Sequence, residues 1–220
     1  EYVLQQITAL KDATISEKDP MVRHNYFTVY AYLCTQFSTA LRPRNNPEIL
    51  FNPDSRAIVI QDKQSANYHE ERILPPANIL SHLLKELRHG IPVIQRHIAK
   101  YHYPAILGQS LESLFFFVDP ETGRIREFTL KGMKGILGDI GIDFELPMNF
   151  PRHYIKNYLY HGDICNDVID MWMGHQHSGR EMLSIISSTM PGSAAVACIY
   201  RTESMLQKIG FSEINYMRGK

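Results

Sequence analysis

The residue pairs Arg152-His153 and Gly174-His175 carry side chains whose chemistry suits a phosphate group. A guanidinium donates paired, charge-assisted hydrogen bonds to phosphate oxygens, and an imidazole adds a further hydrogen bond or transfers a proton. If the chain between the two pairs folds back on itself, Arg152 and His175 lie on one surface. The sequence therefore predicts a phosphate-binding site there.

The segment between these pairs has the spacing of two short amphipathic helices. Its apolar residues recur at helical intervals, and the sequence His161-Gly162-Asp163 interrupts the pattern. Asp163 has the side chain of a helix N-cap, so we expect the second helix to begin there. The apolar positions are Ile155, Tyr158, Leu159, Ile164, Val168, Ile169, Met171, Trp172 and Met173.

Two arginines follow a long apolar helical pattern over residues 21–41, which Asp19 or Pro20 begins. Prolines at two of the next positions forbid further helix and leave Arg42 and Arg44 at its exit. One interpretation is a solvated positive turn that complements the helix dipole. The other is that one of these arginines binds a ligand.

A small hairpin is predicted from the strand patterns at residues 56–63 and 71–75, with Lys63 near its tip. A lysine in a turn is commonly just solvated. Elsewhere the patterns predict helices at residues 2–11 (broken at 14–16), 77–103 (interrupted at 90–92), 129–140 and 193–209 (ending at Gly210), with a short apolar run at 114–118 and a turn at 119–123. The expected fold class is mainly α with a small β-hairpin or sheet.

The composition sets wider limits on the class of protein. The chain has 220 residues, 44% of them hydrophobic, which is enough for a substantial core. Its formal net charge of zero does not indicate a nucleic-acid binder, because such domains are often basic. No run is long and apolar enough to cross a membrane, and no signal-peptide pattern opens the chain. The three cysteines lie far apart among apolar neighbours, so we expect buried thiols in a reducing compartment and no metal site.

The order of these features resembles the catalytic domain of the tyrosine recombinase (phage integrase) family. That family carries an arginine in a Thr-Gly-Leu-Arg pattern, a hairpin lysine, a His-x-x-Arg-His motif and then a Gly-His pair. The chain has Thr39-Ala40-Leu41-Arg42, then Lys63, then Asn149-Phe150-Pro151-Arg152-His153 with Asn149 in place of the first histidine, and Gly174-His175. The resemblance spans roughly residues 20 to 185.

The resemblance implies site-specific recombination or integration of DNA, as in mobile genetic elements, by a mostly helical domain that forms half of a clamp around duplex DNA. Arg42, Arg152 and His175 would stabilise charge on a scissile phosphate, and Lys63 would protonate the leaving 5′ oxygen. Asn149 could donate one hydrogen bond but could not transfer a proton. No metal or cofactor is required, because a tyrosine ester stores the bond energy.

The expected nucleophile is where the sequence departs from the family. Ser184 stands nine positions after His175, where the family has tyrosine, and a serine hydroxyl is far less acidic than a phenol. Tyr200, in the last helical pattern, is the alternative nucleophile, although its position also suits packing in the core. A tyrosine from a partner chain, or a recombinase-like module that binds DNA for regulation or assembly without cutting it, are the other possibilities. The motif matches could also be chance in an all-helical protein.

We expect three segments: an N-terminal linker or helix over residues 1–18, the recombinase-like domain over 19–190, and a C-terminal helix and tail over 191–220. By the resemblance, the last segment packs on a neighbouring protomer in a homo-oligomer on DNA, although packing within the chain fits equally well. A helical core-binding domain would precede Glu1. The resemblance also implies a cytoplasmic protein at the bacterial nucleoid.

Overall fold

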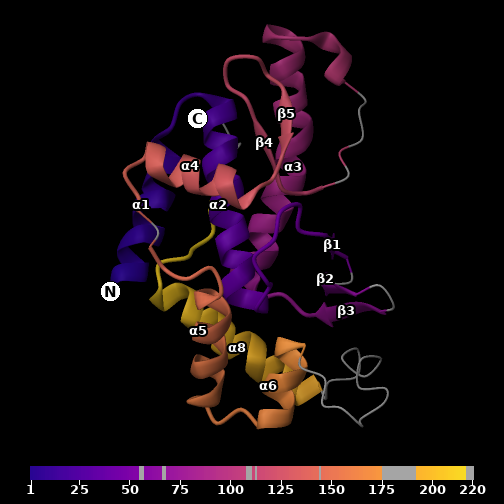
Figure 1. The fold of residues 1–220 in the computed structure, drawn as a ribbon, viewed down its shortest axis with the longest axis vertical. Helices are drawn as coiled ribbons and strands as arrows, with labels where there is room; N and C mark the ends of the chain where they lie inside the picture. Colours follow the sequence, from indigo (N-terminus) through magenta and orange to yellow (C-terminus); the bar gives the residue numbers. More distant parts are fainter. Residues whose placement is uncertain are drawn as a thin grey trace.

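The chain folds into a bundle of helices with two small antiparallel sheets, as a computed structural model shows (Figure 1). The structure describes residues 1–54, 57–65, 68–107, 111, 113–143, 145–174 and 192–216, with only the backbone described at 62–65 and 68–71. The predicted fold class, mainly α with a small sheet, is confirmed. Helix α2 (Pro20–Thr39) lies at the centre, because almost all of its side chains are buried.

Helix α1 (Tyr2–Ser16) packs on α2 through Val3, Ile7 and Leu10. The predicted break at residues 14–16 is wrong, because Thr14 is buried and its hydroxyl donates to the carbonyl of Leu10 within the helix. The prediction for the start of α2 is confirmed. Asp19 is its N-cap, and the carboxylate accepts hydrogen bonds from the next two free backbone N–H groups.

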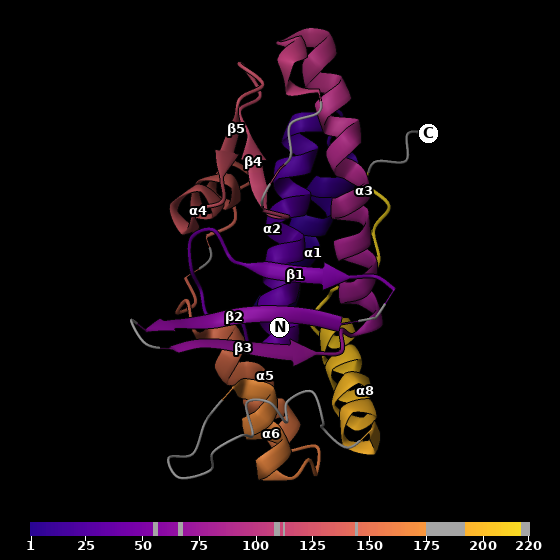
Figure 2. The same cartoon turned by 90° about the vertical axis from the view of Figure 1, so that its right-hand side faces the viewer.

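The predicted hairpin is the pair β2 (Ala57–Ser65) and β3 (Tyr68–Leu74), and its backbone register places Lys63 opposite Glu70. An additional edge strand that the sequence analysis missed, β1 (Ile49–Asn52), pairs with β2 in the order β1-β2-β3. Figure 2 shows the three strands crossing the lower half of α2. Ile58, Ile60 and Leu74, toward the base of the hairpin, are buried in the core that includes α2.

Helix α3 (Asn78–Tyr101) runs without a break through Pro92, so the predicted interruption at residues 90–92 is wrong. Its apolar face stays buried on both sides of the proline, at Leu87 and Ile94, and this packing offsets the missing N–H. The short 3-10 helix η1 (Pro104–Ile106) follows it. The apolar run forms β4 (Phe116–Val118), which pairs with β5 (Ile125–Glu127) across the predicted turn, and α4 (Leu130–Asp139) comes next.

The predicted helix pair is α5 (Phe150–Tyr160) and α6 (Asn166–Met173), and α8 (Gly192–Lys208) is the predicted last helix. Asp163 is not the N-cap of α6: its φ is +60°, and the helix starts three residues later, with Cys165 at the cap. Cys165 is exposed in this loop, so the expectation of three buried thiols is wrong for this one. Cys34 and Cys198 are buried, and burial raises the pKa of the Cys198 thiol to about 11.

One hydrophobic core joins the described α-helices, and a smaller second cluster packs the C-terminal half of α3 with η1 and β4. The larger core includes Leu10 from the predicted N-terminal segment and Leu206 from the predicted C-terminal segment. Helix α8 packs on α5, α2 and α3 of its own chain, and the following segment stacks Tyr216 on Phe27 of α2 with ring centroids 3.8 Å apart. Within the described ranges, no helix is both long and apolar enough to span a membrane.

Candidate phosphate-binding site

The C-terminal ends of α2 and α6 meet. Each helix ends at a residue in the left-handed conformation: Ala40 (φ +57°) after α2 and Gly174 (φ +66°) after α6. The Trp172 indole nitrogen donates to the carbonyl oxygen of Ser38 at 3.0 Å and ties the two ends together. Ala40 stands where the family pattern has glycine, and its backbone conformation is the one that favours glycine.

Arg152 lies in the first turn of α5 and bridges these two helix ends. Its Nη1 donates to the carbonyl oxygen of Ala40 and its Nη2 to that of Met173, each at 2.6 Å. The residue is 8% exposed. Edge-to-face packing of Phe37 from α2 against Phe150 and Tyr154 from α5 aligns the start of α5 with the end of α2. Arg152 therefore sits at the point where three helices converge.

Arg72, on β3, makes a second bridge of the same kind that the sequence analysis missed. Its Nη1 donates to the carbonyl oxygen of Thr39 at 3.0 Å and also to that of Trp172. Arg72 is 4% exposed. The alternation of side chains along a strand could have predicted that Arg72 is buried. Arg72 and Leu74 share the buried face of β3, while Ile73 between them is exposed.

The two arginines meet the C-terminal ends of two helix dipoles at this junction. The C-terminal ends of two helices carry a partial charge of roughly −0.5 each, which by itself repels an anion. Arg72 and Arg152 bring two positive charges to those ends, where their guanidinium groups donate to the terminal carbonyl groups.

Arg42 is exposed and follows Ala40 by two residues, so its backbone lies within roughly 7 Å of the carbonyl that Arg152 holds.

Arg44, the second arginine at this exit, has a structural role. Its Nη1 donates to the carbonyl oxygen of Gln61 on β2 at 2.9 Å, and its Nη2 pairs with Glu48 at 3.5 Å. The loop after α2 is thereby fixed to the strand that carries Lys63.

The remaining predicted residues are only partly placed. Asn149 is the exposed residue before α5, one helical turn before Arg152. The backbone of Lys63 belongs to β2, two residues beyond the carbonyl that Arg44 contacts, but its side chain is outside the described part. His175 and Ser184 lie outside the described residues, which stop at Gly174 and resume at Gly192. The structure thus places the backbones of Arg42 and Asn149 close to Arg152.

Tyr200 is not packed in the core, because 74% of it is exposed on α8. Its neighbour Arg201 lies against Gly162, just beyond the C-terminal end of α5. Arg152 is ten residues before Gly162, which corresponds to roughly 15 Å along a helix. Arg72, Arg152 and the ends of α2 and α6 that they bridge form one site, the arginine junction. Tyr200 therefore lies toward the end of α5 opposite the arginine junction, and the structure does not bring it to Arg152.

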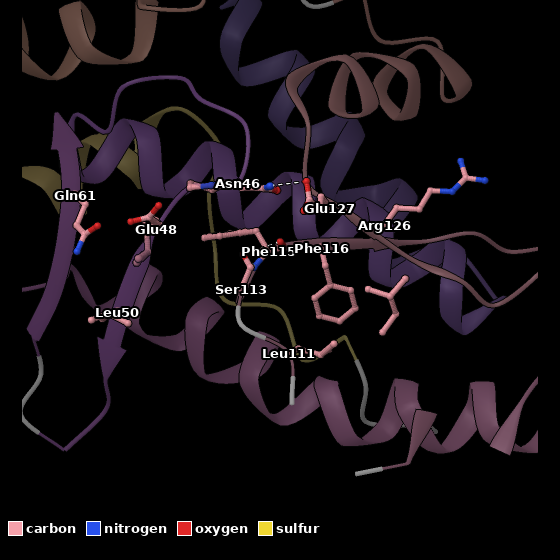
Figure 3. A pocket seen from close by; sticks show the side chains of 13 residues that line it. Asn46, Glu48, Leu50, Gln61, Leu111, Ser113, Phe115, Phe116, Arg126 and Glu127 are labelled. Carbon is pink, nitrogen blue, oxygen red and sulfur yellow. Dashed lines mark hydrogen bonds between the residues drawn. The ribbon is translucent and has the colours of Figure 1, made fainter. Parts of the chain in front are cut away.

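A separate cleft of about 540 Å³ opens between β1 and the β4–β5 pair (Figure 3). Phe115 and Phe116 line it on one side, and the carboxylates of Glu48 and Glu127 belong to its wall. Arg126, which also lines it, pairs with Asp119. Two carboxylates disfavour a phosphate, and none of the predicted site residues whose side chains the structure describes (Arg42, Asn149, Arg152 and Tyr200) lines the cleft. The cleft is therefore a poorer candidate for a phosphate than the arginine junction.

Among the residues that the structure describes, no cluster of histidine, cysteine and carboxylate side chains is placed to hold a metal ion. Comparison of the chain with protein-family models, with curated proteins and with solved structures finds no match. The case for a function consequently depends on the geometry of the arginine junction and on the order of the sequence motifs.

Proposed function

We propose that this chain binds duplex DNA as a tyrosine recombinase-like domain, and that the arginine junction holds a phosphate of the DNA backbone. The observation that carries the proposal is the pair of 2.6 Å hydrogen bonds from Arg152 to Ala40 and Met173. Arg42 follows Ala40 by two residues, and His175 follows Met173 by two. The three residues expected to contact one phosphate, Arg42, Arg152 and His175, thus lie in or within two residues of the segments that Arg152 holds together.

The proposed process is site-specific recombination or integration. The positive charges of Arg42 and Arg152 would stabilise the negative charge that builds on a phosphate under attack. Lys63 would supply a proton to the leaving oxygen, and it lies two residues beyond the Gln61 carbonyl group that accepts from Arg44. His175 would donate to the same phosphate. Asn149, one turn before Arg152, would add a neutral hydrogen bond.

Binding is tested by titrating a short fluorescent duplex with the chain at several salt concentrations. A phosphate site predicts that affinity falls as salt rises, because each phosphate contact releases counterions. Arg42→Ala should weaken binding on all sequences alike, since a phosphate contact carries no sequence information. An affinity that is unchanged by salt and by Arg42→Ala would remove the proposal.

Binding without cleavage is the second candidate, and two observations favour it. Tyr200 lies toward the end of α5 opposite Arg152, and Ser184 stands where the family has its nucleophile. A nicked suicide substrate separates the candidates, because strand cleavage leaves a covalent protein–DNA adduct. An adduct that is lost in Tyr200→Phe supports the enzyme with this nucleophile. Salt-dependent binding with no adduct in any variant supports a regulatory or assembly module.

A further inference from the structure

We propose that Arg72 is a positioning residue for the phosphate site: it fixes both the Lys63 hairpin and the exit of α6 to the end of α2. This inference rests on the proposed function for its significance, since positioning matters only if the site binds a phosphate. From β3, Arg72 bridges the ends of α2 and α6 by its hydrogen bonds to Thr39 and Trp172. It therefore joins the hairpin to both helix ends.

The contact with Gly174 shows how tightly the exit of α6 is held. A Cβ atom at Gly174 would lie inside 3.0 Å of both Cδ and Nε of Arg72. The Arg72 side chain thus packs directly against the residue at which the chain turns into the left-handed conformation, immediately before His175. The end of α6 at Gly174 is consequently held against this side chain.

The register of β2 and β3 relates the position of Arg72 to that of Lys63. Arg72 pairs with Ile60 across the hairpin, and Lys63 lies three residues further along β2, roughly 10 Å at the rise of a strand. Arg44 holds the carbonyl of Gln61 between these two points. A shift of Arg72 relative to Thr39 would therefore move the base of the hairpin relative to Arg42 and Arg152.

Arginine suits this position better than lysine. One terminal nitrogen of a planar guanidinium directs its two hydrogens at two carbonyl groups while Cδ and Nε of the same side chain lie against Gly174. A lysine ammonium has donors for both carbonyl groups but lacks the rigid plane at Nε. Arg72→Lys keeps the charge and alters the geometry, which makes it the informative substitution.

The control is Trp172→Phe, which removes the indole hydrogen bond to Ser38 but keeps both arginines and the backbone carbonyl group of residue 172 that Arg72 contacts. Hydrogen exchange tests the positioning role without DNA. In Arg72→Lys we expect the amides of Ile58 and Ile60 to exchange about tenfold faster than in the wild type, because the hairpin loses its anchor. In Trp172→Phe these hairpin amides should keep their wild-type exchange rates. Equal hairpin exchange in all three proteins would overturn the inference.

DNA titration supplies the second readout. If the two variants have equal thermal stability, Arg72→Lys should bind the duplex about tenfold more weakly than Trp172→Phe. The slope of log affinity against log salt concentration should also be smaller by about one in Arg72→Lys than in Trp172→Phe. Equal binding by the two variants contradicts positioning of the phosphate site. Absence of binding by the wild type contradicts the proposed function but leaves the exchange result for Arg72 intact.

A measurement on the wild type covers the case in which Arg72→Lys does not fold. Nitrogen-15 spectra of the arginine side chains should show a guanidinium whose rotation and hydrogen exchange are slowed by its two carbonyl acceptors, assigned to Arg72 by selective labelling. A rapidly rotating, rapidly exchanging Arg72 guanidinium would mean that the side chain holds neither helix end.

Discussion

The substitution Gly174→Ala tests the geometry of the arginine junction most sharply by stability. Gly174 has a φ of +66°, so an alanine there bears the strain of a left-handed backbone, about 1–2 kcal/mol. The new methyl group would also overlap Cδ and Nε of Arg72. Displacing Arg72 weakens its hydrogen bonds to Thr39 and Trp172, and a hydrogen bond to a charged group contributes about 1.5–3 kcal/mol.

Gly141→Ala is the matched control. Gly141 has a nearly identical φ of +73°, and a Cβ atom there would meet no atom within 4 Å. This variant therefore bears the backbone strain alone, about 1–2 kcal/mol. We expect Gly174→Ala to lower the free energy of unfolding by about 3–5 kcal/mol in total, which exceeds the control by about 2–3 kcal/mol.

Urea denaturation followed by circular dichroism measures both values, and equal slopes against denaturant verify that the two variants unfold from comparable states. A difference between the variants below about 1 kcal/mol would contradict the packing of Arg72 against Gly174. The double variant Gly174→Ala with Arg72→Ala should then be less than additive if the two residues are in contact.

Four further predictions concern other parts of the molecule. Burial lowers the pKa of His24 to about 4, so the unfolded chain takes up a proton first as pH falls below the ordinary value of 6.5. Stability should therefore fall by up to about 3 kcal/mol between pH 6.5 and pH 4, and His24→Gln should remove that part of the pH dependence of thermal unfolding. Arg152→Met leaves two buried carbonyl groups without their donor and should cost about 2–5 kcal/mol in urea denaturation, whereas a cost below that range would mean that the hydrogen bonds contribute little. Asp19→Ala removes the side-chain cap of α2 and should cost about 1 kcal/mol by the same assay. Gly135→Ala adds a methyl group to α4 where no atom lies within 4 Å, and it should stabilise the protein by about 0.5–1 kcal/mol; a destabilised variant would mean that this surface is covered.

The helices of the site were predictable because their signals are local. The apolar periodicity over residues 154–173 gave both helices, and the break at residues 161–163 was confirmed. The hairpin followed from alternation and turn composition in the same way. These features depend on a few neighbouring residues, so the sequence alone specifies them.

The features that escaped prediction depend on tertiary contacts. Strand β1 has only four residues and forms by pairing with β2, and α3 continues through Pro92 because its buried face holds both halves. Asp163 had the chemistry of an N-cap, but the chain takes a left-handed turn there and delays the start of α6. Arg72 was missed because its partners are backbone carbonyl groups of residues far away in the sequence.

The measurement that tests the central claim most directly is the salt dependence of duplex binding for two charge-matched variants. Arg42→Gln removes an exposed cation beside the arginine junction, and Arg124→Gln removes an exposed cation in the turn between β4 and β5. A phosphate site at the junction predicts that Arg42→Gln lowers the slope of log affinity against log salt by about one, while Arg124→Gln leaves it unchanged. Equal slopes in the two variants, or no binding by the wild type, would contradict the claim.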